Sequence, residues 1–182
     1  MKIWKNNLKN DLNIRTQKDY PIKGIEFIDI TPLIIQKETL REIAEGFAEE
    51  LKDKKVDYIV APEARGFLLG TVVANLLGIG CVPIRKKGKL PPITVEKTFD
   101  YEKEYGKDQL ELPKLVNTTY QDKSFYIVDD IYATGNTVKA IQKAIEEMGG
   151  KIVGKGVVMN IVGLNQDDDV FSLLEVEEET NV

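Results

Sequence analysis

Short apolar runs alternate with helical patterns along most of this chain, and this alternation is the feature that most restricts its fold. Apolar residues recur at helical spacing over 40–51, and the strand-like run VDYIVA follows at 56–61. The series continues with a helical segment at 66–78, a strand at 80–84, a strand at 125–128, an amphipathic helix at 138–148 and a strand at 151–162. Strands that alternate with helices indicate an α/β fold with a mainly parallel sheet flanked by helices.

The composition narrows the chain to one ordinary domain and excludes several classes of site. A chain of 182 residues, 42% of them hydrophobic, can form one core, and it contains no internal repeat or linker. With 25 basic and 30 acidic residues and no basic tail, it is not expected to bind nucleic acid nonspecifically. One cysteine and no histidine exclude a disulfide framework, a Cys/His zinc site and a histidine-based triad. A polar N-terminus and the lack of any run of roughly 18 apolar residues predict a soluble protein of a reducing compartment.

The stretch FYIVDDIYATGNT, at 125–137, combines two consecutive acids with a loop that is suited to an anion. Asp129 and Asp130 follow the apolar run, and small or hydroxyl-bearing residues at 133–137 stand where a helix begins. Backbone N–H groups at a helix N-terminus bind phosphate, but the lysine of a nucleotide-binding P-loop is missing. Carboxylates accept hydrogen bonds from a diol, so the stretch predicts a clamp for a ribose 5-phosphate. A plain N-terminal helix cap is the alternative interpretation.

Two groups of basic residues are the other candidates for anion binding. Four cations surround Gly88 at the end of a predicted strand, in a chain that is acidic overall: Arg85, Lys86, Lys87 and Lys89. Arg65 follows another predicted strand and stands with Gly66 before an apolar helix, where N–H groups and a guanidinium can bind a second phosphate. A solvated surface turn and a structural arginine at a helix start are the respective alternatives.

The stretch 125–137 resembles the phosphoribosyl-pyrophosphate motif of the type I phosphoribosyltransferases, and other segments resemble the adenine-specific branch of that family. In the family's order these are GIEFIDITPLI (24–34), PEARGFLLG (62–70), IRKKGKLP (84–91), EYGKDQLEL (104–112) and VFSLLEVE (170–177). The resemblance implies a Rossmann-like core with a small hood at about residues 21–35. It implies a single domain over 1–182, in which residues 1–20 form an N-terminal extension.

The resemblance implies an enzyme of purine salvage. Nitrogen 9 of adenine would displace pyrophosphate from carbon 1 of phosphoribosyl pyrophosphate, which gives AMP and pyrophosphate. Mg²⁺ is the implied cofactor, held mainly by the substrate and not by direct protein ligands. The resemblance also implies a cytoplasmic homodimer in which the partner's basic loop approaches the active site, with no role for nucleic acid or a membrane.

The resemblance also implies roles for individual residues of this chain. Asp129 and Asp130 would hold the ribose diol, and the 5-phosphate would lie on Ala133, Thr134, Gly135, Asn136 and Thr137. The pyrophosphate would meet Arg65, Arg85, Lys86 and Lys89. Glu104 would be the catalytic residue that exchanges a proton with nitrogen 7 of adenine. Phe27 would stack on the adenine ring while the backbone of Glu26 and Ile28 reads its edge.

Departures from the family's pattern keep other interpretations open. Asn136 stands where a second glycine is usual, Glu26 and Ile28 change the base hood, and the loop at 92–103 is longer by about two residues. A transferase for xanthine, hypoxanthine or guanine is one alternative, and a noncatalytic regulator that senses phosphoribosyl pyrophosphate is another. For Glu104 the alternative is a solvent-facing strand residue, and for Phe27 it is a buried core residue.

Overall fold

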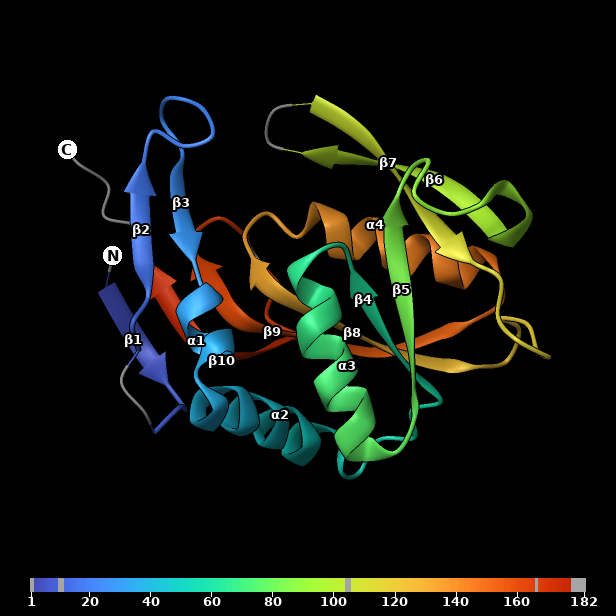
Figure 1. The fold of residues 1–182 in the computed structure, drawn as a ribbon, viewed down its shortest axis with the longest axis horizontal. Helices are drawn as coiled ribbons and strands as arrows, with labels where there is room; N and C mark the ends of the chain where they lie inside the picture. Colours follow the sequence, from blue (N-terminus) through green and yellow to red (C-terminus); the bar gives the residue numbers. More distant parts are fainter. Residues whose placement is uncertain (1, 10–11, 104–105, 166, 178–182) are drawn as a thin grey trace.

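The chain folds around one large sheet, seen in a computed structural model that describes residues 2–9, 12–103, 106–165 and 167–177 (Figure 1). The strands of this sheet are β1 (Lys2–Asn6), β4 (Tyr58–Pro62), β5 (Gly80–Lys86), β6 (Val95–Lys103), β7 (Gly106–Pro113), β8 (Ser124–Tyr132), β9 (Lys151–Val162) and β10 (Val170–Glu177). The helices are α1 (Thr31–Ile35), α2 (Lys37–Leu51), α3 (Arg65–Leu77) and α4 (Asn136–Glu147), with a 3₁₀ turn η1 (Pro92–Thr94). No helix within the described ranges is long and apolar enough to cross a bilayer.

The eight strands lie in the order β1-β10-β9-β8-β4-β5-β7-β6. The five neighbours from β10 to β5 pair in parallel. By contrast, β1 pairs antiparallel with β10 at one edge of the sheet. At the other edge β7 pairs antiparallel with β5, and β6 with β7. The prediction of a mainly parallel α/β sheet is therefore confirmed, and β8 extends beyond the predicted 125–128 so that both aspartates belong to the strand.

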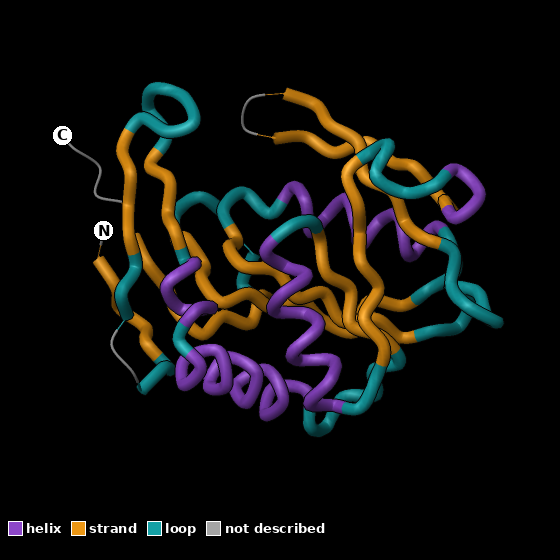
Figure 2. The backbone as a smooth tube through the Cα atoms, in the orientation of Figure 1, coloured by secondary structure: helices purple, strands orange, loops and turns teal. Residues whose placement is uncertain are grey.

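Helices cover both faces of the sheet because successive side chains of a strand point to opposite faces. On β8, Tyr126 and Val128 join the core that includes residues of α2 and α3, whereas Phe125 and Ile127 join the core that includes residues of α4. Figure 2 shows these helices on the two sides of the strands. A Cβ added at Gly70 of α3 would lie 2.6 Å from the Cβ of Ala61, so this helix packs directly on β4. That contact fixes the start of α3 beside the end of β4.

The small hood is a separate two-stranded sheet of β2 (Arg15–Lys18) and β3 (Glu26–Asp29). It stands at the same end of the molecule as the end of β6 and the start of β7, as Figure 1 shows. All four residues of β2 are exposed, so they lack the alternation that signals a strand. The hood therefore begins before the predicted limit of about residue 21. Part of the predicted N-terminal extension, β1, is a strand of the large sheet that pairs with β10.

Candidate functional site

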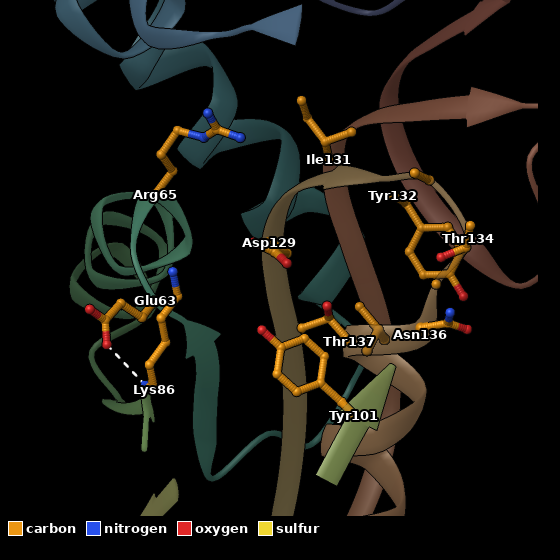
Figure 3. A pocket seen from close by; sticks show the side chains of 13 residues that line it. Glu63, Arg65, Lys86, Tyr101, Asp129, Ile131, Tyr132, Thr134, Asn136 and Thr137 are labelled. Atoms are coloured by element: carbon orange, nitrogen blue, oxygen red, sulfur yellow. Dashed lines mark hydrogen bonds between the residues drawn. The ribbon is translucent and has the colours of Figure 1, made fainter. Parts of the chain in front are cut away.

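Three adjoining cavities open beyond the C-terminal ends of β4 and β8, where parallel sheets usually bind ligands. Their volumes are about 370, 580 and 290 Å³, and Arg65, Asp129 and Thr137 line all three. The first lies over the loop after β8 (Figure 3), the second lies under the hood, and the third lies beside the end of β4. Because they share these side chains, the three cavities form one composite site.

The loop between β8 and α4 forms one wall of the first cavity. Gly135 has a φ of 77°, and a Cβ there would lie 2.2 Å from the Tyr132 hydroxyl oxygen, so the position requires glycine. The helix begins at the next residue, and the first-turn N–H groups of a helix have no acceptor within it. Thr134, Asn136 and Thr137 line the same cavity (Figure 3). Hydroxyl, amide and backbone N–H donors together make this loop suitable for a phosphate.

The acidic pair lies near the end of β8. The backbone N–H of Asp130 donates to Oδ1 of Asp129 at 2.8 Å, and the buried Asp130 carboxylate forms an ion pair with Arg65. Burial first, and then the adjacent Asp130 carboxylate, raise the pKa of Asp129 well above its ordinary value. Arg65 offsets the charge of Asp130, and the raised pKa of Asp129 disfavours its ionised form, so the pair repels a nearby phosphate less than two free carboxylates would.

Arg65, the first residue of α3, connects the parts of the site. Its Nε donates to Oδ2 of Asp130, and its Cζ lies 5.4 Å from the centre of the Phe27 ring, which is a cation–π distance. Figure 3 shows its side chain extending away from the helix. One cation therefore contacts both the acidic pair and an aromatic residue of the hood.

Glu63 is a site residue that sequence analysis did not identify. It lines the first and third cavities, and its Oε2 accepts hydrogen bonds from Arg85 Nε and from the backbone N–H of Lys86, both at 3.0 Å. Partial burial opposes its ionisation, but the bonds from Lys86 and Arg85 outweigh that effect and lower the pKa of Glu63. The only local sign in the sequence is an acid near Arg65, which does not reveal partners on β5.

The structure separates the four predicted pyrophosphate residues into two pairs. Arg65 and Lys86 line the composite site, whereas Arg85 and Lys89 line none of its three cavities. Glu63 holds Arg85, whose Cζ lies 5.7 Å from the centre of the Phe67 ring. Lys89 follows in the turn after β5, where its N–H donates to the Lys86 carbonyl at 3.1 Å.

The second cavity is a slot between the hood and the large sheet. One side is formed by Glu26, Phe27 and Ile28, and the opposite side includes Ile131, Ile161 and Leu164. Phe27 is half-buried, and Tyr20 meets its ring edge-on with 5.3 Å between ring centres. Ile28 is buried in the core. The part of the slot between Phe27 and the apolar side chains opposite it is suitable for a flat ring.

Other residues complete the comparison with the sequence. Glu104 lies outside the described residues, so its role stays a prediction. Tyr101 of β6 lines the first and third cavities (Figure 3). Tyr132 also lines the first cavity, although the sequence did not single it out. Over the described part of the chain, no three cysteine or acidic side chains are grouped in a way that could hold a metal ion.

Comparison with known proteins gives a consistent result. Residues 32–177 match the model of the phosphoribosyl transferase domain. The chain is 46% identical over 168 residues to the adenine phosphoribosyltransferase of Clostridium acetobutylicum, an alignment that covers 90% of this chain and 95% of the relative. It is 43% identical over 169 residues to the adenine phosphoribosyltransferase of Alkaliphilus oremlandii, with 90% and 96% covered.

Solved structures also share the fold. The crystal structure of adenine phosphoribosyltransferase from Thermoanaerobacter pseudethanolicus matches with a TM-score of 0.81 and 39% identity, covering 90% of this chain and 95% of that one. The Saccharomyces cerevisiae enzyme, complexed with D-2,5-dideoxy-2,5-imino-altritol 1,6-bisphosphate and adenine, matches with a TM-score of 0.77 and 34% identity, covering 89% and 94%.

The raised pKa of Asp129 predicts that Asp129→Asn stabilises the protein at neutral pH. Above the ordinary value of 3.8 the unfolded chain loses this proton before the folded chain does, so the stability of the wild type falls as pH rises toward the raised pKa. Asparagine has no such titration, and its oxygen can still accept the bond from the Asp130 N–H. The melting temperature of the variant should exceed that of the wild type at pH 7.5, and the difference should shrink toward pH ~4.

Thermal unfolding followed by circular dichroism between pH 4 and 8 measures this difference. Asp53→Asn, at an exposed position, is the matched control and should show no comparable gain. A destabilised Asp129→Asn protein, or a gain that does not change with pH, would contradict the linkage.

Proposed function

The chain belongs to the phosphoribosyl transferase family, among the adenine phosphoribosyltransferases, and we propose how its own residues carry out the reaction. The enzyme transfers the 5-phosphoribosyl group from phosphoribosyl pyrophosphate to adenine, a purine salvage reaction that gives AMP and pyrophosphate. We treat residues 1–182 as one catalytic domain whose hood includes β2 and β3. The roles are assigned from one observation. The anion-binding loop, the acidic pair and the slot under the hood all line one composite site.

The ribose 5-phosphate is assigned to the end of β8 and the loop after it. The 5-phosphate would accept hydrogen bonds from the backbone and side chains of Ala133, Thr134, Gly135, Asn136 and Thr137. The adjacent Asp129 and Asp130 would accept bonds from the 2- and 3-hydroxyls of the ribose. Asp129, Thr134 and Thr137 line both the first and the second cavity. This supports the binding of the phosphate and the ribose at adjoining parts of one site.

The pyrophosphate is assigned to the third cavity and the adjoining part of the first. Arg65 and Lys86 line this region and would contact the leaving group directly. Arg85 would neutralise the Glu63 carboxylate that lines this region, and Lys89 would add positive charge at longer range. Arg65 would have to exchange its bond to Asp130 for one to the ligand, because Asp130 is also assigned to the diol.

Adenine is assigned to the slot under the hood. Phe27 would stack on one face of the purine, and Ile131 and Leu164 lie on the opposite side of the slot. Among the described residues β3 pairs with β2 alone, which leaves its other edge free, and the backbone of Glu26 and Ile28 would bond to the base edge there. This arrangement would hold nitrogen 9 toward carbon 1 of the ribose.

The reaction breaks the bond between carbon 1 and the pyrophosphate oxygen and forms the bond between carbon 1 and nitrogen 9. Positive charge develops on the ribose as the leaving group departs with its negative charge. Arg65 and Lys86 would stabilise the departing pyrophosphate, while Asp129 and Asp130 lie on the ribose side. Glu104 would take the proton that adenine loses, by way of nitrogen 7.

Mg²⁺ is the proposed cofactor, and the available donors fit it. Carboxylate oxygens of Asp129 and Asp130, with hydroxyls of Thr134 and Thr137, line the site, and Mg²⁺ prefers oxygen ligands and retains several waters. The ion would be held mainly by ligand oxygens, with Asp129 and Asp130 beside it. When bound, it supplies neutralising charge for the pyrophosphate.

The direct test of the proposed function is an incubation of the purified protein with phosphoribosyl pyrophosphate, Mg²⁺ and one base at a time. Adenine should give AMP and pyrophosphate, identified by chromatography and mass spectrometry, while guanine, hypoxanthine and xanthine should give far less nucleotide. Turnover of an oxopurine without adenine would overturn the base assignment. No nucleotide from any of the four bases, with phosphoribosyl pyrophosphate still bound, would favour the noncatalytic sensor.

Glu104→Gln should lower kcat more than it weakens adenine binding. Glutamine fills the same volume and can still bond to the purine edge, but it cannot exchange a proton with nitrogen 7, so kcat should fall about 10²-fold with little change in the KM for adenine. Glu102→Gln, two residues earlier in the chain, is the matched control. A normal kcat for Glu104→Gln would leave Glu104 at most a positional role.

We also propose that the enzyme is a homodimer of the cytoplasm. Support comes from one face of α3, where Leu68 and Leu76 are 54% and 51% exposed and Val72 lies between them at helical spacing. The lone cysteine suits a reducing compartment, which cell fractionation would test. Light scattering should give the mass of a dimer for the wild type and of a monomer for Leu76→Glu. Val116→Glu, at another exposed apolar residue, should stay dimeric. A monomeric wild type would contradict the dimer.

A further inference from the structure

The segment between β9 and β10 lies behind the phosphate loop and bonds to it. Asn165 donates from Nδ2 to the carbonyl oxygen of Ala133 at 2.9 Å. The same amide group lies 3.0 Å from Oδ1 of Asn160 and 3.2 Å from the carbonyl oxygen of Ile161. The side chain is therefore fixed to β9 and reaches the first residue of the loop.

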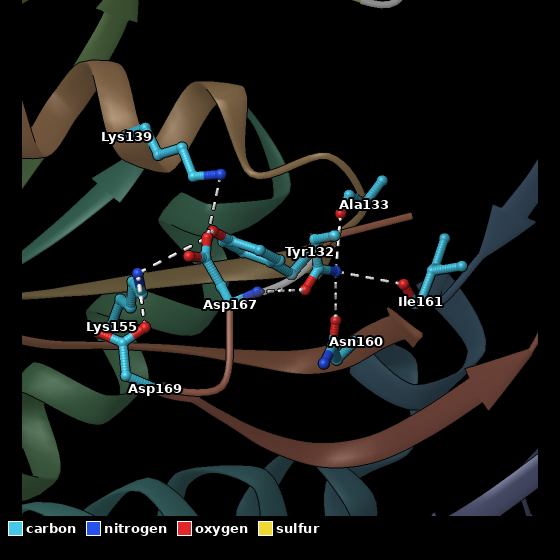
Figure 4. Close-up of polar contacts among 9 residues, drawn as sticks. Tyr132, Ala133, Lys139, Lys155, Asn160, Ile161, Asp167 and Asp169 are labelled. Carbon is cyan, nitrogen blue, oxygen red and sulfur yellow. Dashed lines mark hydrogen bonds and ion pairs between the residues drawn. The ribbon is translucent and has the colours of Figure 1, made fainter. Parts of the chain in front are cut away.

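A second contact from this segment supports the other end of the loop. The Tyr132 hydroxyl donates to Asp167 (Figure 4). The tyrosine also packs so closely against Gly135 that a Cβ there would lie 2.2 Å from its oxygen. The backbone N–H of Asp167 donates in turn to Oδ1 of Asn165 at 3.3 Å. Asn165 and Asp167 therefore form one continuous network that touches the loop at both Ala133 and Gly135.

The charges of this network are balanced. Nζ of Lys139 lies 3.2 Å from the Asp167 carboxylate, and the buried Lys155 lies 3.8 Å from it and 2.9 Å from Asp169. The hydrogen bond from Tyr132 and these lysines lower the pKa of Asp167 despite its partial burial. Two lysines thus face two carboxylates, so these four side chains add no net negative charge near an anion bound in the loop.

The bond from Asn165 determines which way one peptide of the loop points. In a trans peptide the carbonyl of one residue and the N–H of the next point in opposite directions. Because Asn165 holds the Ala133 carbonyl behind the loop, the N–H of Thr134 is directed to the other side, and Thr134 lines the cavity. If this peptide rotated, a carbonyl oxygen would face the phosphate in place of a donor.

We propose that Asn165 is a positioning residue for the 5-phosphate of the substrate, with Asp167 and Tyr132 as its supporting partners. The proposal rests on the proposed function, which puts the phosphate in this loop, and adds a specific device that orients the loop. Asn165 acts through the Ala133–Thr134 peptide. Its loss should therefore weaken ligands that carry the 5-phosphate and spare ligands that occupy the other parts of the site.

The test compares Asn165→Ala and Asn165→Asp with the wild type in the full-length enzyme. The aspartate of the second variant would keep an oxygen for the Asp167 N–H, but it would lack the amide donors and would put a negative charge beside three acceptor oxygens, so its effect should be at least as large as that of alanine. The inhibition constant of ribose 5-phosphate and the KM for phosphoribosyl pyrophosphate should rise about five- to tenfold, the usual worth of one hydrogen bond. The inhibition constant of pyrophosphate and the KM for adenine should stay within about twofold. Asn7→Ala, at an exposed position directly after β1, is the control.

The outcomes separate this proposal from the proposed function. A wild type that forms AMP, together with unchanged ribose 5-phosphate inhibition in both Asn165 variants, would overturn the positioning role alone. A uniform loss for all ligands that follows the melting temperature would also overturn it, because that pattern indicates general destabilisation. A wild type with no transferase activity would overturn the proposed function itself.

Tyr132→Phe gives an independent measurement if the Asn165 variants do not fold. The ring would stay against Gly135, but the hydroxyl bond to Asp167 would be lost. We expect the same selective effect on ribose 5-phosphate, at about two- to threefold. An effect on pyrophosphate inhibition as large as that on ribose 5-phosphate would contradict the positioning network.

Discussion

The parallel pairing of β8 on both sides is the constraint on which the site depends. This strand pairs with β4 along one edge and with β9 along the other, and its residues 125–128 are buried in two cores. A shift of register by one residue would exchange the apolar side chains between those cores, so the register is strongly fixed. The acidic pair, the phosphate loop and the start of α4 follow directly on this strand. Their positions are therefore set by the sheet and not by the loop alone.

The site brings carboxylates close to the place where anions are expected to bind, and the surroundings of each carboxylate reduce or offset its negative charge. Arg65 pairs with Asp130, and burial with a neighbouring charge favours the protonated form of Asp129. Glu63 is bonded to Arg85 and to a backbone N–H on β5. Behind the loop, Asp167 lies between two lysines. The chain can thus be acidic overall and still present donors and cations to a phosphorylated ligand.

Features encoded in short stretches of sequence were predictable, whereas features that join distant stretches were not. The acidic pair and residues 133–137 are neighbours in the chain, so their meeting at a strand end could be predicted without tertiary information. The pairing of Glu63 with Arg85 depends on the register of β4 with β5, and Asn165 lies 32 residues from Ala133. β2 was missed because all of its residues are exposed. Glu104 lies outside the described residues and stays a prediction.

The most direct test of the central claim is a crystal structure of the protein with AMP bound. The account predicts that phosphate oxygens accept hydrogen bonds from the N–H groups of residues 134–137, that the ribose hydroxyls bond to Asp129 and Asp130, and that the base lies against Phe27. A phosphate held by Arg65 and Lys86, with the ribose hydroxyls turned away from the acidic pair, would contradict it.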